Sequence, residues 1–344
     1  MIAIRDIISH LESIAPPAYQ ESYDNAGLIV GQADRACTGV ITCLDATEAV
    51  VEEAIAHQCN LIVAHHPIVF SGLKRFTGRT YVERVVIKAI RHDIAIYAIH
   101  TNLDNIYHQG VNSQIAARLG LVNTRILAPK SNLKRATIFC PIANGEALKD
   151  ALEQVIQGAQ TPAQPIRQIG VGSRAEGASL QIDVVFPSHL QGRVQQVLAQ
   201  FPACDPLFSE VANHNPTTGA GLVGELPKAL DEKAFLKLLK TRMQAGCVKY
   251  TPLLGQAVQT VALCGGAGGF LLGAAKAAGA QVFITSDYKY HEFFDAENRI
   301  VIADIGHYES EQFTIELLAT IIKEKFGNFA VRLTAVNTNP VSYL

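Results

Sequence analysis

Both ends of this chain alternate between short apolar segments typical of strands and amphipathic segments typical of helices, and this rhythm constrains the fold more than any other feature. In the first third, residues 39–45, 60–66 and 94–100 are predicted strands, and the stretches after them space their apolar residues as helices do. The same order recurs over residues 258–326. Because apolar strands separated by helices are typical of a largely parallel sheet covered by helices, the sequence predicts an α/β fold.

The middle of the chain breaks this rhythm, with short strands and amphipathic helices in the order of a small α+β domain. We predict that residues 1–130 and 216–344 are two similar three-layer α/β halves of one metal-binding domain, interrupted by a small α+β domain at residues 131–215. A Gln-, Pro- and Gly-rich stretch lies inside the insert, at residues 158–172.

Composition excludes several classes of protein. Hydrophobic residues make up 49% of the chain and charged residues 17%, which is the balance of a globular protein rather than a disordered one. A net charge of −2 provides no broad basic field, so nucleic acid is an unlikely partner. The seven cysteines form no C-x-x-C pair, and no apolar run approaches the roughly 18 residues of a membrane span. We therefore expect a cytoplasmic protein without membrane contact.

Polar side chains stand where several predicted strands end. Asp45, His65 and His100 do so in the first half, and Asp287, His291 and His307 do so in the second. In open α/β sheets, ligands bind beyond the carboxyl ends of the strands. These residues therefore mark the expected position of a site.

Two adjacent histidines, His65 and His66, follow the strand at residues 60–66. Adjacent side chains at a strand end diverge, so the pair suits two separate metal ions better than one. The alternative is a pair of surface or hydrogen-bonded histidines, since imidazole is common at strand ends.

Two further segments carry side chains able to bind metal. His307 and Glu311 are four residues apart at the start of the last predicted helix, where they would share one face, and a carboxylate can bridge two ions. The alternative is an acidic first turn favoured by the helix dipole, which does not account for His307. Asp104 can ligate a divalent ion, with His100 and Asn102 orienting its neighbours, or it can belong to an ordinary turn.

The glycine-rich turn at residues 263–269 follows a strand and precedes a helix. It matches neither a P-loop nor a dinucleotide fingerprint. Close packing of the helix on the sheet is the favoured interpretation, and an auxiliary contact to a phosphate is the alternative.

Six motifs occur in the order seen in one known family. They are YDNAGLIVG (23–31), AHHP (64–67), HTNLDN (100–105), LCGGAGG (263–269), TSDYKYH (285–291) and GHYESE (306–311). The chain thus resembles the Nif-three-like family of dinuclear metal-binding proteins, many of which are named homologues of GTP cyclohydrolase I type 2. Its middle segment is similar to the PII/CutA-like insert of the longer members, although it is abbreviated around residues 158–172.

The resemblance implies two divalent metal ions per subunit, held by His65, His66, Asp104, His307 and Glu311. It places His66 and Asp104 on one ion and His65 and His307 on the other, with Glu311 bridging them. Other residues match polar positions around the family's site and are expected to support the ligands or contact substrate: Asp45, His100, Asp287 and His291. The resemblance also implies a toroidal homo-hexamer whose sites face an inner cavity.

A two-ion site with open coordination positions predicts a metal-dependent hydrolase of a nucleotide-like or phosphorylated small molecule, with His100 or His291 moving a proton. GTP cyclohydrolase activity, which needs attack on the purine ring with loss of formate, is neither required nor excluded. Histidine and carboxylate ligands suit zinc, manganese, iron, cobalt or nickel. The alternative is a non-catalytic metal-binding or regulatory assembly in which the insert senses a ligand.

Overall fold

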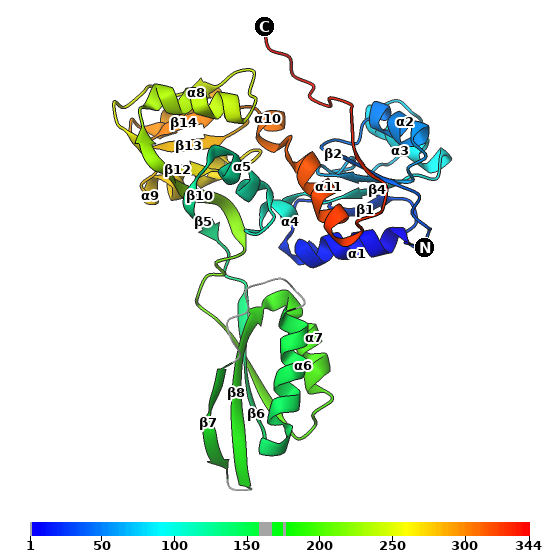
Figure 1. Cartoon of the computed structure of the whole chain (residues 1–344), viewed down its shortest axis with the longest axis vertical. Coiled ribbons are helices and arrows are strands. Elements are labelled where there is room, and N and C mark those ends of the chain that lie inside the picture. The colour runs from blue at the N-terminus through cyan, green and yellow to red at the C-terminus, as the bar shows by residue number, and fades with distance from the viewer. Residues whose placement is uncertain (1, 158–166, 175–176) are drawn as a thin grey trace. The chain divides into compact units, whose positions relative to one another are not determined.

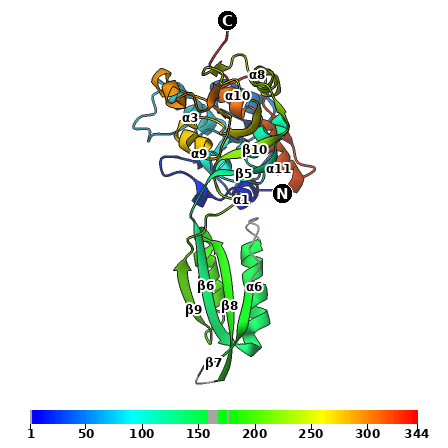
Figure 2. The same cartoon turned by 90° about the vertical axis from the view of Figure 1, so that its left-hand side faces the viewer.

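The computed structural model divides the chain into two compact units, Met1–Ala128 with Gly219–Leu344, and Pro129–Thr218. The larger unit contains two sheets and the smaller unit contains one (Figures 1 and 2). The α/β fold class predicted from the alternation of strands and helices is confirmed. The first part of the Gln-, Pro- and Gly-rich stretch lies outside the described residues, which are 2–157, 167–174 and 177–344.

The first sheet is parallel except at one edge. Its strands, in spatial order, are β1 (Gly27–Val30), β4 (Ala95–Ala98), β3 (Leu61–Ala64), β2 (Val40–Cys43) and β15 (Val331–Leu333). Only β1 is antiparallel to its neighbour. Every residue of β2, β3 and β4 is buried, as expected of strands covered on both faces.

The second sheet has a parallel centre and antiparallel neighbours. Its strands, in spatial order, are β11 (Lys249–Tyr250), β14 (Val301–Asp304), β13 (Val282–Thr285), β12 (Val258–Leu263), β10 (Gly219–Leu230) and β5 (Val122–Pro129). β12, β13 and β14 run parallel, whereas β10 and β11 are antiparallel to their partners. The two halves exchange edge strands: β5 comes from the first half of the sequence, and β15 returns to the first sheet.

Helices cover both faces of each sheet. On the first sheet, α1 (Ile4–Ile14) and α11 (Thr314–Lys325) pack on one face, and α2 (Glu48–Ala56) and α3 (Tyr81–Arg91) pack on the other. On the second sheet, α5 (Val111–Leu119) and α8 (Glu232–Arg242) lie opposite α9 (Leu272–Ala277). Thr47 and Thr80 start α2 and α3 in the usual way, because each hydroxyl accepts a hydrogen bond from a backbone N–H of the first turn.

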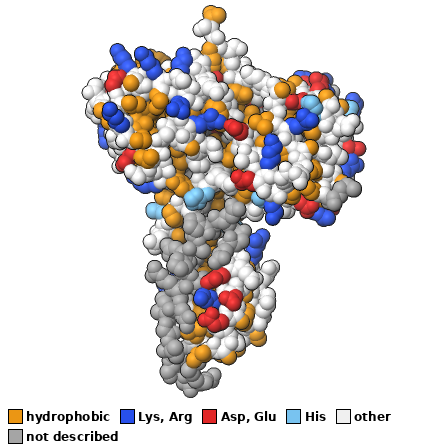
Figure 3. Space-filling view, viewed as in Figure 1, with side chains coloured by type: hydrophobic (Ala, Val, Ile, Leu, Met, Phe, Trp, Pro, Cys, Tyr) orange, Lys and Arg blue, Asp and Glu red, His pale blue; other side chains and the backbone are white. Residues whose placement is uncertain are grey.

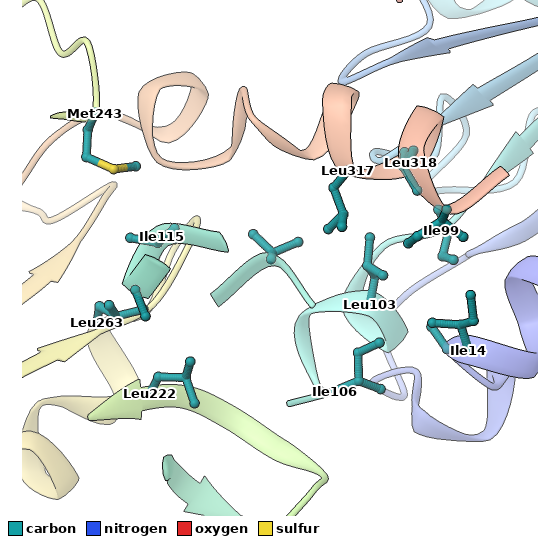
Figure 4. Close-up of a cluster of buried hydrophobic side chains, with 14 of the residues drawn as sticks. Ile14, Ile99, Leu103, Ile106, Ile115, Leu222, Met243, Leu263, Leu317 and Leu318 are labelled. Carbon is teal, nitrogen blue, oxygen red and sulfur yellow. The ribbon is translucent and has the colours of Figure 1, made fainter. Parts of the chain in front are cut away.

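One buried cluster joins the two halves of the larger unit. Figure 1 shows α4 (Thr101–Asp104), α5, α10 (His307–Glu311) and α11 between the two sheets. Figure 4 shows Leu103 and Leu317, from α4 and α11, in the same cluster as Leu222 and Leu263 of the second sheet. The core is therefore continuous across the region where the ends of the two parallel sheets meet.

The smaller unit has a core of its own. Its sheet is antiparallel throughout, with the strand order β7 (Arg167–Arg174), β8 (Gly177–Pro187), β6 (Leu133–Pro141) and β9 (Asp205–Glu210). The helices α6 (Gly145–Gln157) and α7 (Gln191–Leu198) pack on it. That this insert is PII/CutA-like stays a prediction.

Neither the surface charge of the larger unit nor the length of its helices identifies where in the cell the protein resides. Over the larger unit, the face shown in Figure 3 carries Lys and Arg side chains spread among Asp and Glu. Within the described part of the chain, no helix combines the length and apolar character needed to cross a bilayer. The cytoplasmic location stays a prediction.

Truncating Leu103 tests the role of the shared core. Leu103 is fully buried, so Leu103→Ala should lower the free energy of unfolding by about 2–5 kcal/mol through lost burial and the cavity left behind. Urea unfolding followed by circular dichroism measures this change. In the matched control Leu333→Ala, the side chain is 44% exposed and the change should stay within about 0.5 kcal/mol. Equal effects of the two substitutions would contradict a shared core centred on α4.

Candidate metal centre

Polar side chains that follow strands of both sheets in the larger unit lie close together. His65 and His66 follow β3, and Asp104 ends the short α4 that follows β4. From the second sheet, β14 leads into α10, which begins at His307 and ends at Glu311. All five side chains predicted as ligands contribute atoms to two overlapping groups that could hold a metal ion, and His65, His66 and His100 form a third.

The first group consists of His65, Asp104 and Glu311. The Nδ1 of His65 donates to the carbonyl of Ile99 at 2.8 Å, so its Nε2 carries a lone pair. That Nε2 lies 3.5 Å from Asp104 Oδ1 and 3.9 Å from Glu311 Oε1. Both His65 Nε2 and Asp104 Oδ1 are buried without a hydrogen-bond partner among the described residues. Buried acceptors facing one another are unfavourable alone, and a cation between them satisfies all three.

The second group consists of His66, His307 and Glu311. The Nε2 atoms of the two histidines are 3.3 Å apart and lie 3.0 and 3.1 Å from Glu311 Oε2. Their Nδ1 atoms donate to Asp45 at 2.8 Å and to Asp287 at 2.5 Å, which directs both Nε2 atoms at the same point. Each oxygen of Glu311 therefore faces a different group.

The buried carboxylate of Glu311 depends on positive charge around it, which protonated imidazoles or a metal ion can supply. Burial alone would raise the pKa of Glu311, but the surrounding imidazoles, His307 foremost, hold it well below its usual value. Burial and the nearby Glu311 raise the pKa of Asp104 to about 7. Burial would lower the pKa of His66, yet hydrogen bonds to Asp45 and Glu311 raise it to about 9. Near neutral pH, metal ions therefore compete with protons for these ligands.

The pairing of ligands on the two ions stays a prediction. The resemblance places His66 with Asp104 and His65 with His307, whereas the groups of neighbouring ligand atoms in the structure join His65 to Asp104 and His66 to His307. The reason is the strand order, in which β3 lies between β4 and β2. The side chain of His65 points toward the end of β4, where the carbonyl of Ile99 accepts a hydrogen bond from its Nδ1. The side chain of His66 points toward Asp45, which follows β2.

The remaining predicted residues divide into three kinds. Asp45 and Asp287 orient the ligands His66 and His307 through their Nδ1 atoms. Asn102 is buried away from the site, where its carboxamide bonds the backbone of Ala15 and His100. His291 is exposed and lies outside both metal groups and the cavity beside them, so the structure does not bring it into the site.

His100 lies beside the first histidines and depends on a residue that sequence reasoning missed. Its ring centroid is 5.3 Å from those of His65 and His66, and its Nδ1 donates to Asp24 at 2.8 Å. The other oxygen of Asp24 accepts from Thr101 Oγ1 at 2.6 Å. The motif at residues 23–31 contained this acid, but nothing in its spacing indicated a partner 76 residues away.

The end of the chain also reaches the site, and no sequence pattern predicted this. The hydroxyl of Thr338 donates to Asp45 Oδ2 at 2.8 Å, while the other oxygen of Asp45 accepts from His66. Asn339 donates to Glu309 at 3.1 Å. The terminal segment thus supports the carboxylate that orients a ligand.

The glycine-rich turn packs directly against Glu311. Gly266 has a φ of +64°, and a Cβ there would lie 2.5 Å from Glu311 Oε1. The N–H groups of Gly265, Gly266 and Gly268 donate to Asn112, Ser310 and Thr285, each at 2.9 Å. The turn is therefore shaped to admit the buried carboxylate.

Comparison with known proteins identifies the family of the chain. The pattern of the family described as Duf34/NIF3 (NGG1p interacting factor 3) matches residues 2–340. The chain belongs to the Duf34/NIF3 family. It is 30% identical to a Staphylococcus aureus (strain MSSA476) protein named GTP cyclohydrolase 1 type 2 homolog, over 99% of this chain and 100% of that protein. A Staphylococcus epidermidis (strain ATCC 12228 / FDA PCI 1200) protein of the same name is 29% identical over 99% of both chains.

Solved structures of Duf34/NIF3 relatives share the fold over the full length. The crystal structure of a Bacillus cereus protein related to NIF3 aligns with a TM-score of 0.83 at 28% identity, covering 100% of this chain and 99% of that one. A Staphylococcus aureus protein aligns with a TM-score of 0.84 at 29% identity and the same coverage. The resemblance seen in the six motifs is therefore confirmed at the level of the family.

Adding a methyl group at Gly266 tests the close contact in this Duf34/NIF3 protein. Gly266→Ala should displace Glu311 and weaken Zn²⁺ binding at least about ten-fold, measured by equilibrium dialysis. Gly279→Ala is the matched control, because Gly279 has a φ of +73° but open space around its Cβ position. Both variants carry the strain of a positive φ, and only the first should lose metal affinity. Equal losses would contradict the proposed contact.

Acidification tests Asp24. Burial opposes its ionisation, but hydrogen bonds from His100 and Thr101 lower its pKa to about 2. Because this folded pKa lies below the usual value of about 3.9, the carboxylate stabilises the folded state above about pH 4 and loses that effect as the pH falls toward 2. Asp24→Asn should therefore destabilise the protein fully at pH 7 and progressively less below pH 4, as followed by urea unfolding.

The exposed Asp34 supplies the control for that pH series. Its side chain is 82% exposed and pairs only with the exposed Arg5, so Asp34→Asn should change stability little at any pH. A destabilisation by Asp24→Asn that stays constant from pH 7 to the acid range would show that ionisation of Asp24 is not its source.

Proposed function

We propose that this protein is a metal-dependent hydrolase of a nucleotide-like or phosphorylated small molecule, with two divalent metal ions in its site. The observation that carries the proposal is that Glu311 belongs to two groups of three ligands, one with His65 and Asp104 and one with His66 and His307. Three protein ligands per ion leave coordination positions for water and substrate, as in catalytic rather than closed structural sites. The donors suit zinc, manganese, iron, cobalt or nickel.

A cavity beside the two groups has room for a substrate. Its volume is about 860 Å³, and its lining includes His66, His100, Asp104, His307 and Glu311. Volumes of this order hold small organic ligands. When bound, divalent ions would supply Lewis-acid activation of water and of a substrate oxygen.

Three carboxylates of the chain orient histidines of the site, and one of these histidines can transfer a proton. Asp24 holds His100 by Nδ1, which leaves Nε2 to take or return a proton at the cavity. Asp45 and Asp287 hold His66 and His307 by Nδ1 and keep their Nε2 atoms directed at Glu311. Of the two histidines considered as proton carriers, His100 is the one that lines the cavity.

The names of relatives supply a reaction to test. Several Staphylococcus proteins are named GTP cyclohydrolase 1 type 2 homolog, and that reaction needs hydrolytic attack on a purine ring with loss of formate. The family resemblance further supports a homo-hexamer with sites facing an inner cavity. A cytoplasmic location fits the unpaired cysteines, because all seven are free.

A regulatory assembly is the second candidate. The residues Pro129–Thr218 form a compact unit with a separate core, which suits a PII/CutA-like module that senses a ligand. In that case, ligands would raise the unfolding temperature without being converted.

Replacing the shared carboxylate separates the two functions. Glu311→Gln should reduce the metal content measured by elemental analysis and lower turnover of any substrate found in a nucleotide and phosphoester panel by at least about 100-fold, since even partners behind the ligands contribute 10–100-fold. The control is Glu316→Gln, whose carboxylate is 65% exposed on α11 and pairs with Arg118. Turnover that survives Glu311→Gln would contradict the two-metal hydrolase, and metal-dependent ligand binding without turnover would favour the regulatory assembly.

A further inference from the structure

The cavity is rich in carboxylates and poor in cations. Among the described residues, seven acidic side chains line it, whereas Lys249 is the one Lys or Arg that does. Lys249 is already paired, because its Nζ lies 2.7 Å from Asp304, which is 1% exposed. The acidic side chains are Glu21, Asp45, Asp104, Asp287, Asp304, Glu309 and Glu311.

Two bound ions would not reverse this balance. Two divalent cations bring four positive charges and Lys249 brings a fifth, against seven negative charges from the carboxylates. The cavity then keeps an excess of two negative charges with its histidines neutral. After burial, the carboxylates of Glu21, Asp104 and Asp24 raise the pKa of Tyr23, as expected where the potential is negative.

Part of the backbone of the glycine-rich turn is already used in hydrogen bonds. The turn at residues 263–269 borders the cavity, and phosphate-binding turns work by directing free N–H groups at the anion. Here the N–H groups of Gly265, Gly266 and Gly268 are taken by Asn112, Ser310 and Thr285. These three N–H groups are therefore not free to bind a phosphate, and the auxiliary phosphate contact stays an alternative for the rest of the turn.

Aromatic rings make up much of the rest of the lining. Tyr23, Phe70, Tyr81 and Phe270 border the cavity, and each is more than half exposed, with exposed fractions from 55% to 73%. The ring of Phe70 lies edge-on to His100 with centroids 5.7 Å apart, which places an apolar face beside the proposed proton carrier. Exposed aromatic faces next to hydrogen-bonding groups suit a flat heterocycle.

We propose that the cavity selects an uncharged planar heterocycle of the nucleobase or nucleoside class and discriminates against nucleoside triphosphates. This inference rests on the proposed two-metal site and narrows its substrate class. A triphosphate would bring about four further negative charges into a cavity that keeps negative charge in excess even with both ions bound, and no unpaired Lys or Arg among the described lining residues is available to receive them. A neutral ring can stack on the aromatic faces, and its amino groups can donate hydrogen bonds to the carboxylates.

Matched ligands test the charge preference directly. Full-length protein loaded with Zn²⁺ is titrated calorimetrically with guanosine and GTP, and with adenosine and ATP, while its metal content is monitored. At least one nucleoside should bind about ten-fold or more tightly than its triphosphate, with an affinity that salt hardly changes. A triphosphate that binds as tightly as its nucleoside, or the failure of every nucleoside to bind, overturns the proposal.

Phe70 and Phe76 provide a matched pair of variants for the aromatic wall. Both rings are exposed, at 55% and 58%, but only Phe70 lines the cavity. Phe70→Ala should weaken nucleoside binding roughly five- to 150-fold at unchanged metal content, and Phe76→Ala should not. Equal effects of the two substitutions would overturn the stacking role.

Adding a cation tests the electrostatic part. Val341 lines the cavity, so Val341→Lys should improve triphosphate binding more than nucleoside binding, whereas Val122→Lys outside it should change neither. An unchanged triphosphate affinity in Val341→Lys would overturn the charge argument. Failure of the proposed two-metal function can be distinguished from failure of this charge preference. In the first case the protein takes up no metal before any ligand is added.

Discussion

The burial of the Glu311 carboxylate is the constraint on which the site depends. Only 2% of this residue is exposed, and an ionised carboxylate at that depth needs positive charge or hydrogen-bond donors on both oxygens. One oxygen faces His65 and Asp104, and the other faces His66 and His307. Gly266 lacks a Cβ where Glu311 passes, and Ser310 bonds the same turn, so the neighbouring backbone is shaped around this one side chain.

Continuity of the core explains how ligands from distant parts of the chain keep their positions. The two sheets exchange edge strands, since β5 belongs to the second sheet and β15 to the first. α4 and α11 contribute Leu103 and Leu317 to the cluster that joins the halves. Because close-packed interiors resist small displacements, the relative positions of His66 and His307 are held by packing as well as by their carboxylate partners.

The carboxylates that hold cations and orient the ligands also determine the net charge of the cavity. Asp104 and Glu311 serve cations, and Asp45 and Asp287 orient imidazoles, yet all four add to the negative potential that a substrate meets. Carboxylates that hold cations and orient ligands therefore also repel a polyanion, to the extent that bound ions or Lys and Arg side chains do not offset their charge. Here Lys249 is committed to Asp304.

Sequence periodicity determined the α/β class and the strand ends at which polar groups gather, because strand periodicity and the end of a strand are local properties. The set of five converging side chains came from the resemblance to a family, which carries information that no local pattern holds. The sequence did not determine which histidine faces which carboxylate. That depends on β3 lying between β4 and β2, and strand order is a property of the whole sheet. Likewise, the bonds of Asp24 to His100 and of Thr338 to Asp45 join residues 76 and 293 positions apart. Only tertiary packing brings such residues within hydrogen-bonding distance, and no local pattern records it.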